Sequence, residues 1–261
     1  MQLLTFSKFS PVILFRALKY AKIHSDTYCI VLSIQGQEGV RFMKEFIRKY
    51  RHAWLILAYL PIYLIWFFLL EQQVKEYHII ESPLDACIPF NELFIAPYLL
   101  WFPFIAVSVL YFIFRDRTEC YRLCGTLIAG MTVFLLVSTV FPNGVSLRPV
   151  LSELGRENLF LDLVAGLHKA DTSTNVCPSI HVYNSLAVCF AFFVSVHCKG
   201  KRLFKAGVLL LTVLICLSTV FLKQHSVIDV FWAFALFAVT APICYARRLF
   251  KKEHRADTVS E

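Results

Sequence analysis

The sequence predicts an all-α, polytopic membrane protein, folded as a bundle of six transmembrane helices. Hydrophobic residues make up 58% of the 261-residue chain, and its mean hydropathy is +0.63. A soluble domain contains only about 45–50% apolar residues. The apolar residues are also gathered into blocks of the length that crosses a hydrocarbon layer about 30 Å thick, which takes about 20 helical residues.

Six blocks meet this length requirement to within a few residues, and each is apolar on all sides, as membrane-embedded helices are. They cover residues 53–70, 94–114, 125–141, 181–198, 206–222 and 226–245. Together they define a predicted membrane domain at 53–246, followed by a short cytoplasmic tail at 247–261.

Residues 1–52 mix basic and apolar residues instead of forming an apolar block. Phe42, Phe46 and Tyr50 are spaced by four, which places them on one face of a helix. We predict an amphipathic helix at the cytoplasmic surface of the membrane. A solvated, charged tail is the alternative.

The distribution of basic residues predicts the orientation. The side that carries both termini holds 21 of the 26 Lys and Arg residues, and the opposite side holds 5. Positively charged loops stay in the cytoplasm, so both termini are expected inside and loops 71–93, 142–180 and 223–225 outside. A multi-pass protein of the cell membrane explains the net charge of +8. No basic segment carries the motifs of a nucleic-acid-binding protein, so nucleic acid is not an expected partner.

Three short polar segments lie at the outer ends of predicted spans, where they are expected to meet on one face of the membrane. The first, after the third span, ends in Arg148-Pro149. The second, Cys177-Pro178-Ser179-Ile180-His181, opens the fourth span. The third joins the last two spans and runs from Ser218 through His225 to Asp229.

The third segment carries a candidate nucleophile. His225 and Asp229 are four residues apart and therefore share a helical face. A carboxylate that accepts a hydrogen bond from one ring nitrogen leaves the other nitrogen free to attack. A carboxylate inside a span is costly and suggests a function. A structural polar contact between spans is the alternative for Asp229.

The second segment suits a phosphate. A helix that starts after Pro178 presents free amides and a positive dipole to an anion. Ser179 adds a hydroxyl, and His181 can protonate a leaving alkoxide as a general acid. A lone histidine at the end of a span is more often an ordinary interfacial residue, so the hypothesis depends on the other two segments.

Two cations complete the candidate site. Arg148 offers a planar fork that matches phosphate oxygens, and Lys223 offers a point charge two residues before His225. Both are also explained as interfacial cations whose heads reach water.

The order and internal spacing of these segments resemble those of the type 2 phosphatidic acid phosphatase superfamily, over about residues 94–245. Its signatures are Lys-x6-Arg-Pro, Pro-Ser-x-His and Ser-Arg-x5-His-x3-Asp. The resemblance implies the haloperoxidase-like helical bundle of that superfamily. It also implies that His225 forms a phosphohistidine, Asp229 orients it, His181 is the general acid, and Arg148 and Ser179 bind phosphate. Neither metal nor cofactor is expected.

Two positions depart from these signatures. Phe141 stands where the first has Lys, and Thr219 stands where the third has Arg. Two phosphate-binding cations are therefore missing, of which Lys223 is a candidate replacement. The altered pattern is similar to the branch that includes inositol phosphorylceramide synthases, which pass the phosphoryl-linked headgroup to an alcohol.

Three functions follow, and the first is favoured. It is hydrolysis of a lipid phosphate, such as phosphatidic acid or a polyprenyl phosphate, drawn from the surrounding membrane lipids. The second is transfer of the phosphoryl-linked group to a lipid hydroxyl, with residues 150–176 lining the access route. The third is a non-catalytic transporter or scaffold with a proton-relaying Asp229, although no internal repeat is visible. The sequence predicts no oligomeric state.

Cys87 and Cys177 both fall in predicted outward loops. An oxidising exterior permits a disulfide between them. Two independent cysteines are the alternative.

The predicted orientation can be tested by cysteine labelling of intact cells. A single cysteine introduced at Ser152 should react with a membrane-impermeant maleimide, because loop 142–180 is expected outside. A cysteine at Lys199 should react only after permeabilisation. The probes are introduced into a Cys87→Ser background, so that the native cysteine of the first predicted outward loop does not react. The reverse labelling pattern would contradict the orientation.

Overall fold

The computed structural model describes residues 41, 43–73 and 76–257. The chain divides into two units, Met1–Arg51 and His52–Glu261, one residue from the boundary that the sequence predicts. In the first unit residues 43–49 are helical, and the ring centroids of Phe46 and Tyr50 lie 4.7 Å apart. Most of the predicted amphipathic helix, including Phe42, lies outside the described residues.

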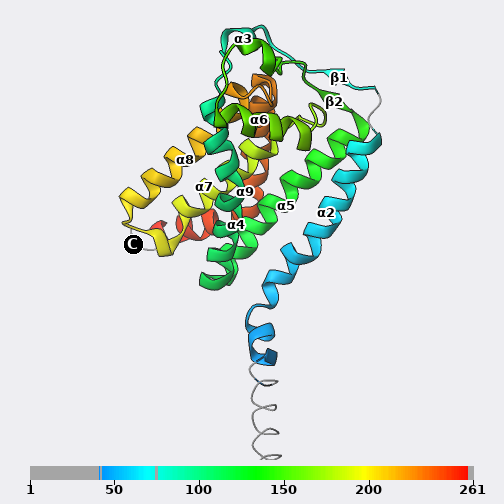
Figure 1. Cartoon of the computed structure of the whole chain (residues 1–261). Coiled ribbons are helices and arrows are strands. Elements are labelled where there is room, and N and C mark those ends of the chain that lie inside the picture. Colours follow the sequence, from blue (N-terminus) through cyan, green and yellow to red (C-terminus); the bar gives the residue numbers. More distant parts are fainter. Residues whose placement is uncertain (1–40, 42, 74–75, 258–261) are drawn as a thin grey trace, which may run out of the picture. The chain divides into compact units, whose positions relative to one another are not determined.

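The second unit is built from helices, as the sequence predicts. It consists mainly of α2 (Trp54–Gln73), α4 (Ile95–Arg115), α5 (Arg117–Val140), α7 (Ile180–Val194), α8 (Arg202–Phe221) and α9 (Val227–Asp257) (Figure 1). Among the described residues, five helices are long and apolar enough to cross a membrane, namely α2, α4, α5, α8 and the part of α9 up to Ala246. The chain is therefore an all-α, multi-pass membrane protein.

The predicted fourth span, 181–198, is shorter than expected. Helix α7 has 15 residues and is about 22 Å long, whereas the hydrocarbon layer is about 30 Å thick. It packs against α4, α5, α8 and α9, and ten of its residues are buried. Beyond Ser195 the chain continues as the short helix η4 (Val196–Cys198). Because neighbouring helices surround α7, its side chains face protein more than lipid.

Helix α5 is longer than the predicted span 125–141. It begins at Arg117, where the carboxylate of Asp116 accepts a hydrogen bond from the Glu119 amide at 2.8 Å and caps the helix. A side-chain acceptor at this position satisfies an otherwise unpaired amide of the first turn. The first two turns carry charged residues, so hydropathy alone does not detect them.

The connections opposite the α4–α5 turn are also structured, and they gather at one end of the bundle (Figure 1). They contain α3 (Pro83–Cys87), η2 (Glu92–Phe94), η3 (Leu151–Leu154), α6 (Leu159–Ala170) and two parallel two-residue strands, β1 (His78–Ile79) and β2 (Asn143–Gly144). A further short helix, η1 (Arg51–Ala53), precedes α2. The sequence predicted only loops at 71–93 and 142–180.

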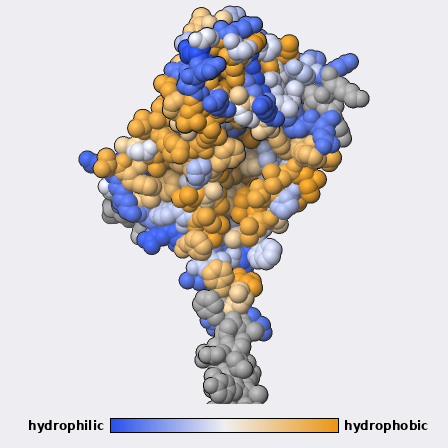
Figure 2. Space-filling model, in the orientation of Figure 1, coloured by the Kyte–Doolittle hydropathy of each residue, from blue (hydrophilic) through white to orange (hydrophobic). Residues whose placement is uncertain are grey.

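The sides of the bundle are hydrophobic. Figure 2 shows apolar residues over the lateral face of the helices and hydrophilic residues gathered at the end that carries α3 and α6. Large side chains such as Ile65 on α2, Val107 on α4 and Leu210 on α8 are more than 60% exposed. Exposed apolar side chains in a continuous band are expected where helices face lipid.

The contact between α5 and α7 depends on a glycine. A Cβ atom at Gly130 would lie 1.9 Å from the ring of Tyr183. That ring is held in place because the Tyr183 hydroxyl donates to the carbonyl of Thr126 at 2.7 Å and lies 2.7 Å from the hydroxyl of Thr240. The absence of a side chain at Gly130 lets the two helices approach closely.

We expect Gly130→Ala to lower the stability of the folded protein, because the fixed ring of Tyr183 cannot move aside. Overpacking of this kind costs about 1–3 kcal/mol. Thermal unfolding in detergent measures the effect. The matched control is Gly207→Ala on α8, where an added Cβ meets nothing within 4 Å. Equal unfolding temperatures for the two variants would contradict the importance of this contact.

Candidate active site

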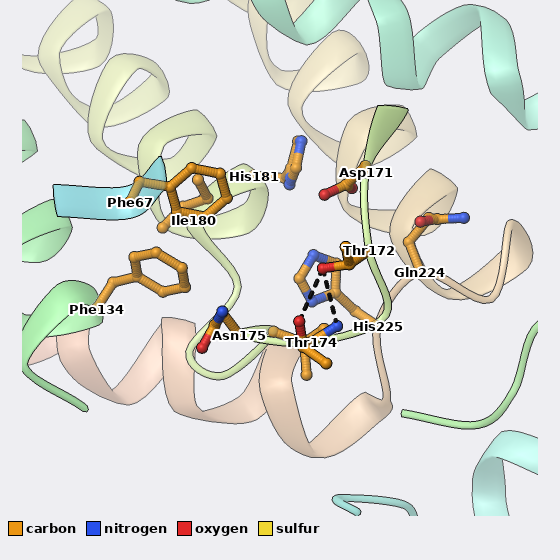
Figure 3. A pocket seen from close by; sticks show the side chains of 11 residues that line it. Phe67, Phe134, Asp171, Thr172, Thr174, Asn175, Ile180, His181, Gln224 and His225 are labelled. Carbon is orange, nitrogen blue, oxygen red and sulfur yellow. Dashed lines mark hydrogen bonds between the residues drawn. The ribbon is translucent and has the colours of Figure 1, made fainter. Parts of the chain in front are cut away.

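A cavity lies at the end of the bundle that the structured loops cover. It has a volume of about 50 Å³, and Figure 3 shows the side chains around it. Its lining among the described residues comes from α2, α5, the loop before α7, α7 itself and the α8–α9 turn: Phe67, Phe134, Asp171, Thr172, Thr174, Asn175, Val176, Ile180, His181, Gln224 and His225. Both predicted catalytic histidines therefore line one cavity.

The predicted pair of His225 and Asp229 is brought together. Helix α9 begins at Val227, so Asp229 lies in its first turn, with no exposed surface. Its Oδ2 atom is 3.4 Å from Nδ1 of His225 and accepts a hydrogen bond from the Ser226 amide at 2.9 Å. The first distance exceeds that of an ordinary N–H···O bond.

The second histidine approaches from helix α7, whereas His225 lies in the α8–α9 turn. The ring centroid of His181, on α7, lies 5.7 Å from that of His225, and the two rings meet edge to face. Tyr98 and Trp101 of α4 pack against His181 with centroids 4.6 Å and 4.4 Å away. Its Nδ1 atom is buried and has no hydrogen-bond partner within the described part of the chain. Aromatic packing thus fixes the ring and leaves this nitrogen free.

Ser179 lies where the starts of α7 and α9 meet. Its amide donates to the carbonyl of Asp229 at 3.2 Å. Its hydroxyl is fully buried and has no partner in the described structure. The first turn of α7 also carries amides that a helix leaves unpaired. A free hydroxyl beside such amides is suited to an anion. Ser179 itself is not among the described residues that line the cavity, whereas the next two residues, Ile180 and His181, are.

The Arg148 side chain holds together residues that form the wall of the cavity. Its guanidinium donates to the carbonyls of Asp171 and Thr172, both at 2.8 Å, and to the Gln224 side chain at 2.5 Å. Burial lowers the pKa of Arg148. Although Arg148 itself is not among the described lining residues, Asp171, Thr172 and Gln224 are. The arginine therefore joins the loop before α7 to the α8–α9 turn.

Lys223 points away from the cavity. Its ammonium group is buried and donates to the backbone carbonyl of Asp85 on α3 at 2.5 Å. Thr219 and Phe141, which stand where the superfamily signatures have cations, make local contacts instead. The Thr219 hydroxyl donates to the carbonyl of Cys216 at 2.8 Å, and the ring of Phe141 stacks on that of His78 with centroids 4.5 Å apart.

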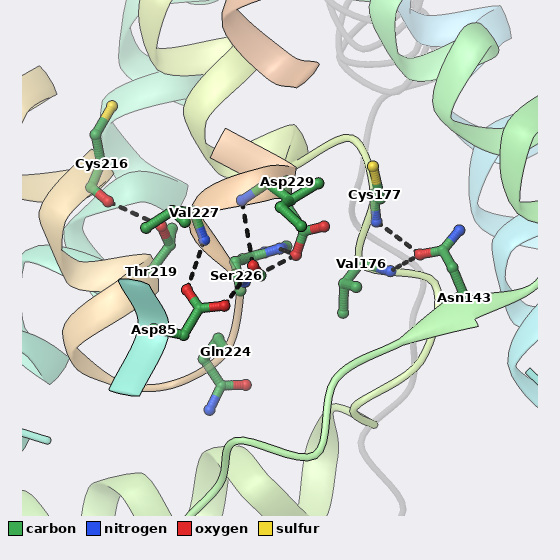
Figure 4. Close-up of polar contacts among 12 residues, drawn as sticks. Asp85, Asn143, Val176, Cys177, Cys216, Thr219, Gln224, Ser226, Val227 and Asp229 are labelled. Carbon is green, nitrogen blue, oxygen red and sulfur yellow. Dashed lines mark hydrogen bonds and ion pairs between the residues drawn. The ribbon is translucent and has the colours of Figure 1, made fainter. Parts of the chain in front are cut away.

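Asn143 joins the first and second predicted segments, a role that the sequence did not indicate. Its side-chain oxygen accepts hydrogen bonds from the amides of Val176 and Cys177 at 3.0 Å and 2.8 Å (Figure 4). Its carbonyl accepts a third, from the Asn175 amide at 2.6 Å. The residue is fully buried. It thereby sets the path of the chain just before Pro178 and Ser179.

Two acidic residues of the site were also missed. Asp171 lines the cavity, and Figure 3 shows its carboxylate on the same side as the two imidazoles. Burial raises the pKa of Asp171, and the charges of Arg148 and His225 oppose that increase. Glu71, near the end of α2, accepts hydrogen bonds from the hydroxyl of Thr172 and, at 2.8 Å, from the side-chain amide of Asn175. A single carboxylate in a loop or at the end of a helix gives no periodic signal that marks it as part of a site.

The possible disulfide between Cys87 and Cys177 is not formed, because both residues are free thiols. Cys87 is exposed at the end of α3, whereas Cys177 is buried beneath Asn143. Burial raises the pKa of Cys177 to about 12.

Within the described residues, no group of three or more His, Cys, Asp and Glu side chains is arranged to hold a metal ion. Comparison of the chain with protein-family models, with curated proteins and with solved structures gives no match. The chemistry of the site must therefore be argued from its own residues.

We expect Asn143→Ala to destabilise the loop that leads into α7. The substitution strips the Val176 and Cys177 amides of their acceptor, and each buried unpaired amide costs about 1–3 kcal/mol. Thermal unfolding in detergent should show a clear decrease. Asn91→Ala is the control, because Asn91 accepts one bond from the Leu93 amide at 3.0 Å in the exposed start of η2. A decrease no larger than that of Asn91→Ala would contradict this role for Asn143.

Proposed function

We propose that this protein is a membrane-embedded enzyme that removes phosphate from a lipid phosphate through a phosphohistidine intermediate. The observation that carries the proposal is the pair of imidazoles, His181 on α7 and His225 in the α8–α9 turn, that line one cavity. Asp229 lies behind His225 at 3.4 Å. A nucleophile with an orienting carboxylate and a second proton-transfer group are the parts that covalent phosphoryl transfer needs.

The proposed reaction has two steps. In the first, Nε2 of His225 attacks phosphorus, the bond from phosphorus to the lipid oxygen breaks, and protonated His181 gives its proton to the leaving alkoxide. The Asp229 carboxylate stabilises the charge that develops on the His225 ring. In the second, water attacks the phosphohistidine and yields its proton to His181. The P–N bond then breaks, and inorganic phosphate leaves with both histidines restored.

The anion is proposed to bind at the start of α7. The first-turn amides and the free hydroxyl of Ser179 would donate hydrogen bonds to phosphate oxygens there. The described cavity lining contains no Lys or Arg. Arg148 would therefore act indirectly, by holding Asp171, Thr172 and Gln224 in the wall of the cavity. This departs from the direct phosphate contact that the sequence suggested for Arg148 and Lys223. A weakly cationic site favours a substrate with few negative charges.

A hydrophobic groove beside the site supports a lipid substrate. It has a volume of about 520 Å³ and runs between α5 and α9, with residues such as Val137, Trp232 and Leu236 on its walls. Cys177 and Pro178, which directly precede Ser179, also line it. A hydrocarbon chain in this groove would approach the site from within the bilayer.

Under this proposal, the chain belongs to the type 2 phosphatidic acid phosphatase superfamily and has six spans, with α7 as the short fourth. Its termini are cytoplasmic and its site faces outward from the cell membrane. Five residues of the segment 150–176 that was expected to line the access route border the cavity: Asp171, Thr172, Thr174, Asn175 and Val176.

Transfer to an alcohol is the second candidate, and the Asp171 carboxyl favours it. A carboxylate that borders the cavity can accept a hydrogen bond from an acceptor hydroxyl in place of water. Incubation with radiolabelled phosphatidic acid and an alcohol such as glycerol separates the two functions. Hydrolysis gives inorganic phosphate, whereas transfer gives a new phosphoester in its place.

We expect His225→Ala to abolish turnover of long-chain phosphatidic acid, since no covalent intermediate forms without the imidazole. Asp229→Asn should leave a weaker enzyme, because an amide favours a different tautomer and stabilises imidazolium poorly. His181→Ala should slow turnover by about 10²–10⁴-fold, the usual contribution of general acid catalysis. Phosphate release from purified protein measures these rates. His197→Ala, at the opposite end of α7, is the matched control and should retain full activity.

Acid-labile, base-stable phosphate should be trapped on the wild type and not on His225→Ala. EDTA should change no rate, because the proposed charge stabilisation comes from protein groups. Full activity in His225→Ala would contradict the proposal. So would complete loss in EDTA that a single divalent ion restores.

A further inference from the structure

Asp85 is a buried carboxylate that the proposed reaction does not use. It lies on the five-residue helix α3 in the first outward loop, and it is only 2% exposed. An isolated buried carboxylate is costly, and such groups persist where several donors satisfy them. The donors around Asp85 therefore indicate which segments of the chain this carboxylate holds in place.

Three donors contact this carboxylate, and two of them belong to the start of α9. The Ser226 hydroxyl donates to Oδ2 of Asp85 at 2.6 Å, and the Val227 amide donates to Oδ1 at 2.8 Å (Figure 4). The third donor is the Ser82 amide, at 2.7 Å from Oδ2, within the capping box of α3. One side chain thus caps two helices that are separated by about 140 residues of sequence.

These contacts are linked to the proposed nucleophile, His225, through the residues beside it in the chain. Ser226, which Asp85 holds by its hydroxyl, gives its amide to Asp229 Oδ2 at 2.9 Å. His225 immediately precedes Ser226, and its Nδ1 lies 3.4 Å from the same Asp229 atom. On the other side of His225, the Lys223 ammonium donates to the Asp85 backbone carbonyl at 2.5 Å. The catalytic turn is therefore attached to α3 on both sides of His225.

We infer that Asp85 is a positioning residue for the His225–Asp229 pair, which it sets by fixing the backbone of the α8–α9 turn. The inference rests on the proposed function for its kinetic consequence. Its structural content, that Asp85 determines how the His225 ring is held, is independent of the substrate. The first outward loop thereby becomes part of the catalytic apparatus without touching the reacting atoms.

The kinetic test compares Asp85→Ala and Asp85→Asn with the wild type on long-chain phosphatidic acid. Loss of both contacts to α9 should lower kcat of Asp85→Ala by about 10²-fold, the effect of a misplacement of about 1 Å. KM should stay within about twofold, because the phosphate site on α7 is untouched. Asp85→Asn keeps one acceptor oxygen and should lose less. Rates are normalised to the folded fraction from gel filtration and thermal unfolding.

Ser82→Ala is the matched control. It removes the contact from the Leu84 amide to the Ser82 hydroxyl at 3.3 Å, at the start of α3, and leaves both contacts from Asp85 to α9. Its kcat should equal that of the wild type. Ser226→Ala removes one contact from the other side, and its effect should not add to that of Asp85→Asn, since the two residues share one hydrogen bond.

A second measurement needs no turnover. Histidine-selective ¹⁵N NMR in detergent micelles reports the tautomer of His225, whose signals are identified by their loss in His225→Ala. We expect these signals to shift in Asp85→Asn and to stay unchanged in Ser82→Ala. Wild-type signals and wild-type kcat in folded Asp85→Asn and Asp85→Ala would overturn the inference. Equal loss of kcat in Ser82→Ala would also overturn it.

The failures of the two proposals are distinguishable. If the wild type turns over no phosphate ester, the proposed function fails, and the NMR comparison alone decides the role of Asp85. If the wild type is active and folded Asp85 variants are equally active, only the inference about Asp85 fails. If Asp85→Ala does not fold, Asp85→Asn and Ser226→Ala carry both measurements.

Discussion

The carboxylate of Asp229 is the constraint on which the loop-covered end of this bundle depends. It is wholly buried in the first turn of α9, where an ionised group is expensive unless donors surround it. Its Oδ2 atom accepts a hydrogen bond from the Ser226 amide at 2.9 Å and lies 3.4 Å from Nδ1 of His225, whereas its Oδ1 atom is buried with no partner in the described part of the chain. The Ser179 amide binds the backbone carbonyl of the same residue. The starts of α7 and α9 must therefore meet at Asp229, and the loops that cover them follow from this contact.

The membrane architecture and the meeting of the two histidines could be predicted from the sequence. Hydropathy is summed over about 20 residues, so single substitutions or local errors hardly affect it. The spacing of His225 and Asp229 corresponds to one helical turn, and His181 opens another span on the same side. Short-range periodicity together with alternating topology is enough to place these three residues on one face.

The supporting contacts could not be predicted, because they join loops over long sequence separations. Asn143 reaches the amides of Val176 and Cys177, Arg148 reaches Gln224, and Asp85 reaches Ser226. No periodic pattern relates these positions, and each contact exists only once the loops have folded against one another. The same limit applies to Arg148, whose charge suggested a phosphate ligand while its three acceptors lie in the cavity wall.

Under the proposed function, the shortness of α7 bears on how the products would leave. A helix of about 22 Å cannot reach both surfaces of a layer about 30 Å thick, so as the proposed fourth span it would have an end recessed below the lipid headgroups. If the recessed end is the one that carries Ser179 and His181, the two products of the proposed lipid phosphate cleavage would separate there. The hydrophobic alcohol can diffuse sideways into the bilayer, whereas the liberated anion needs a hydrated exit past the loop at 171–176. Opening of that loop would then control how quickly the anion is discharged.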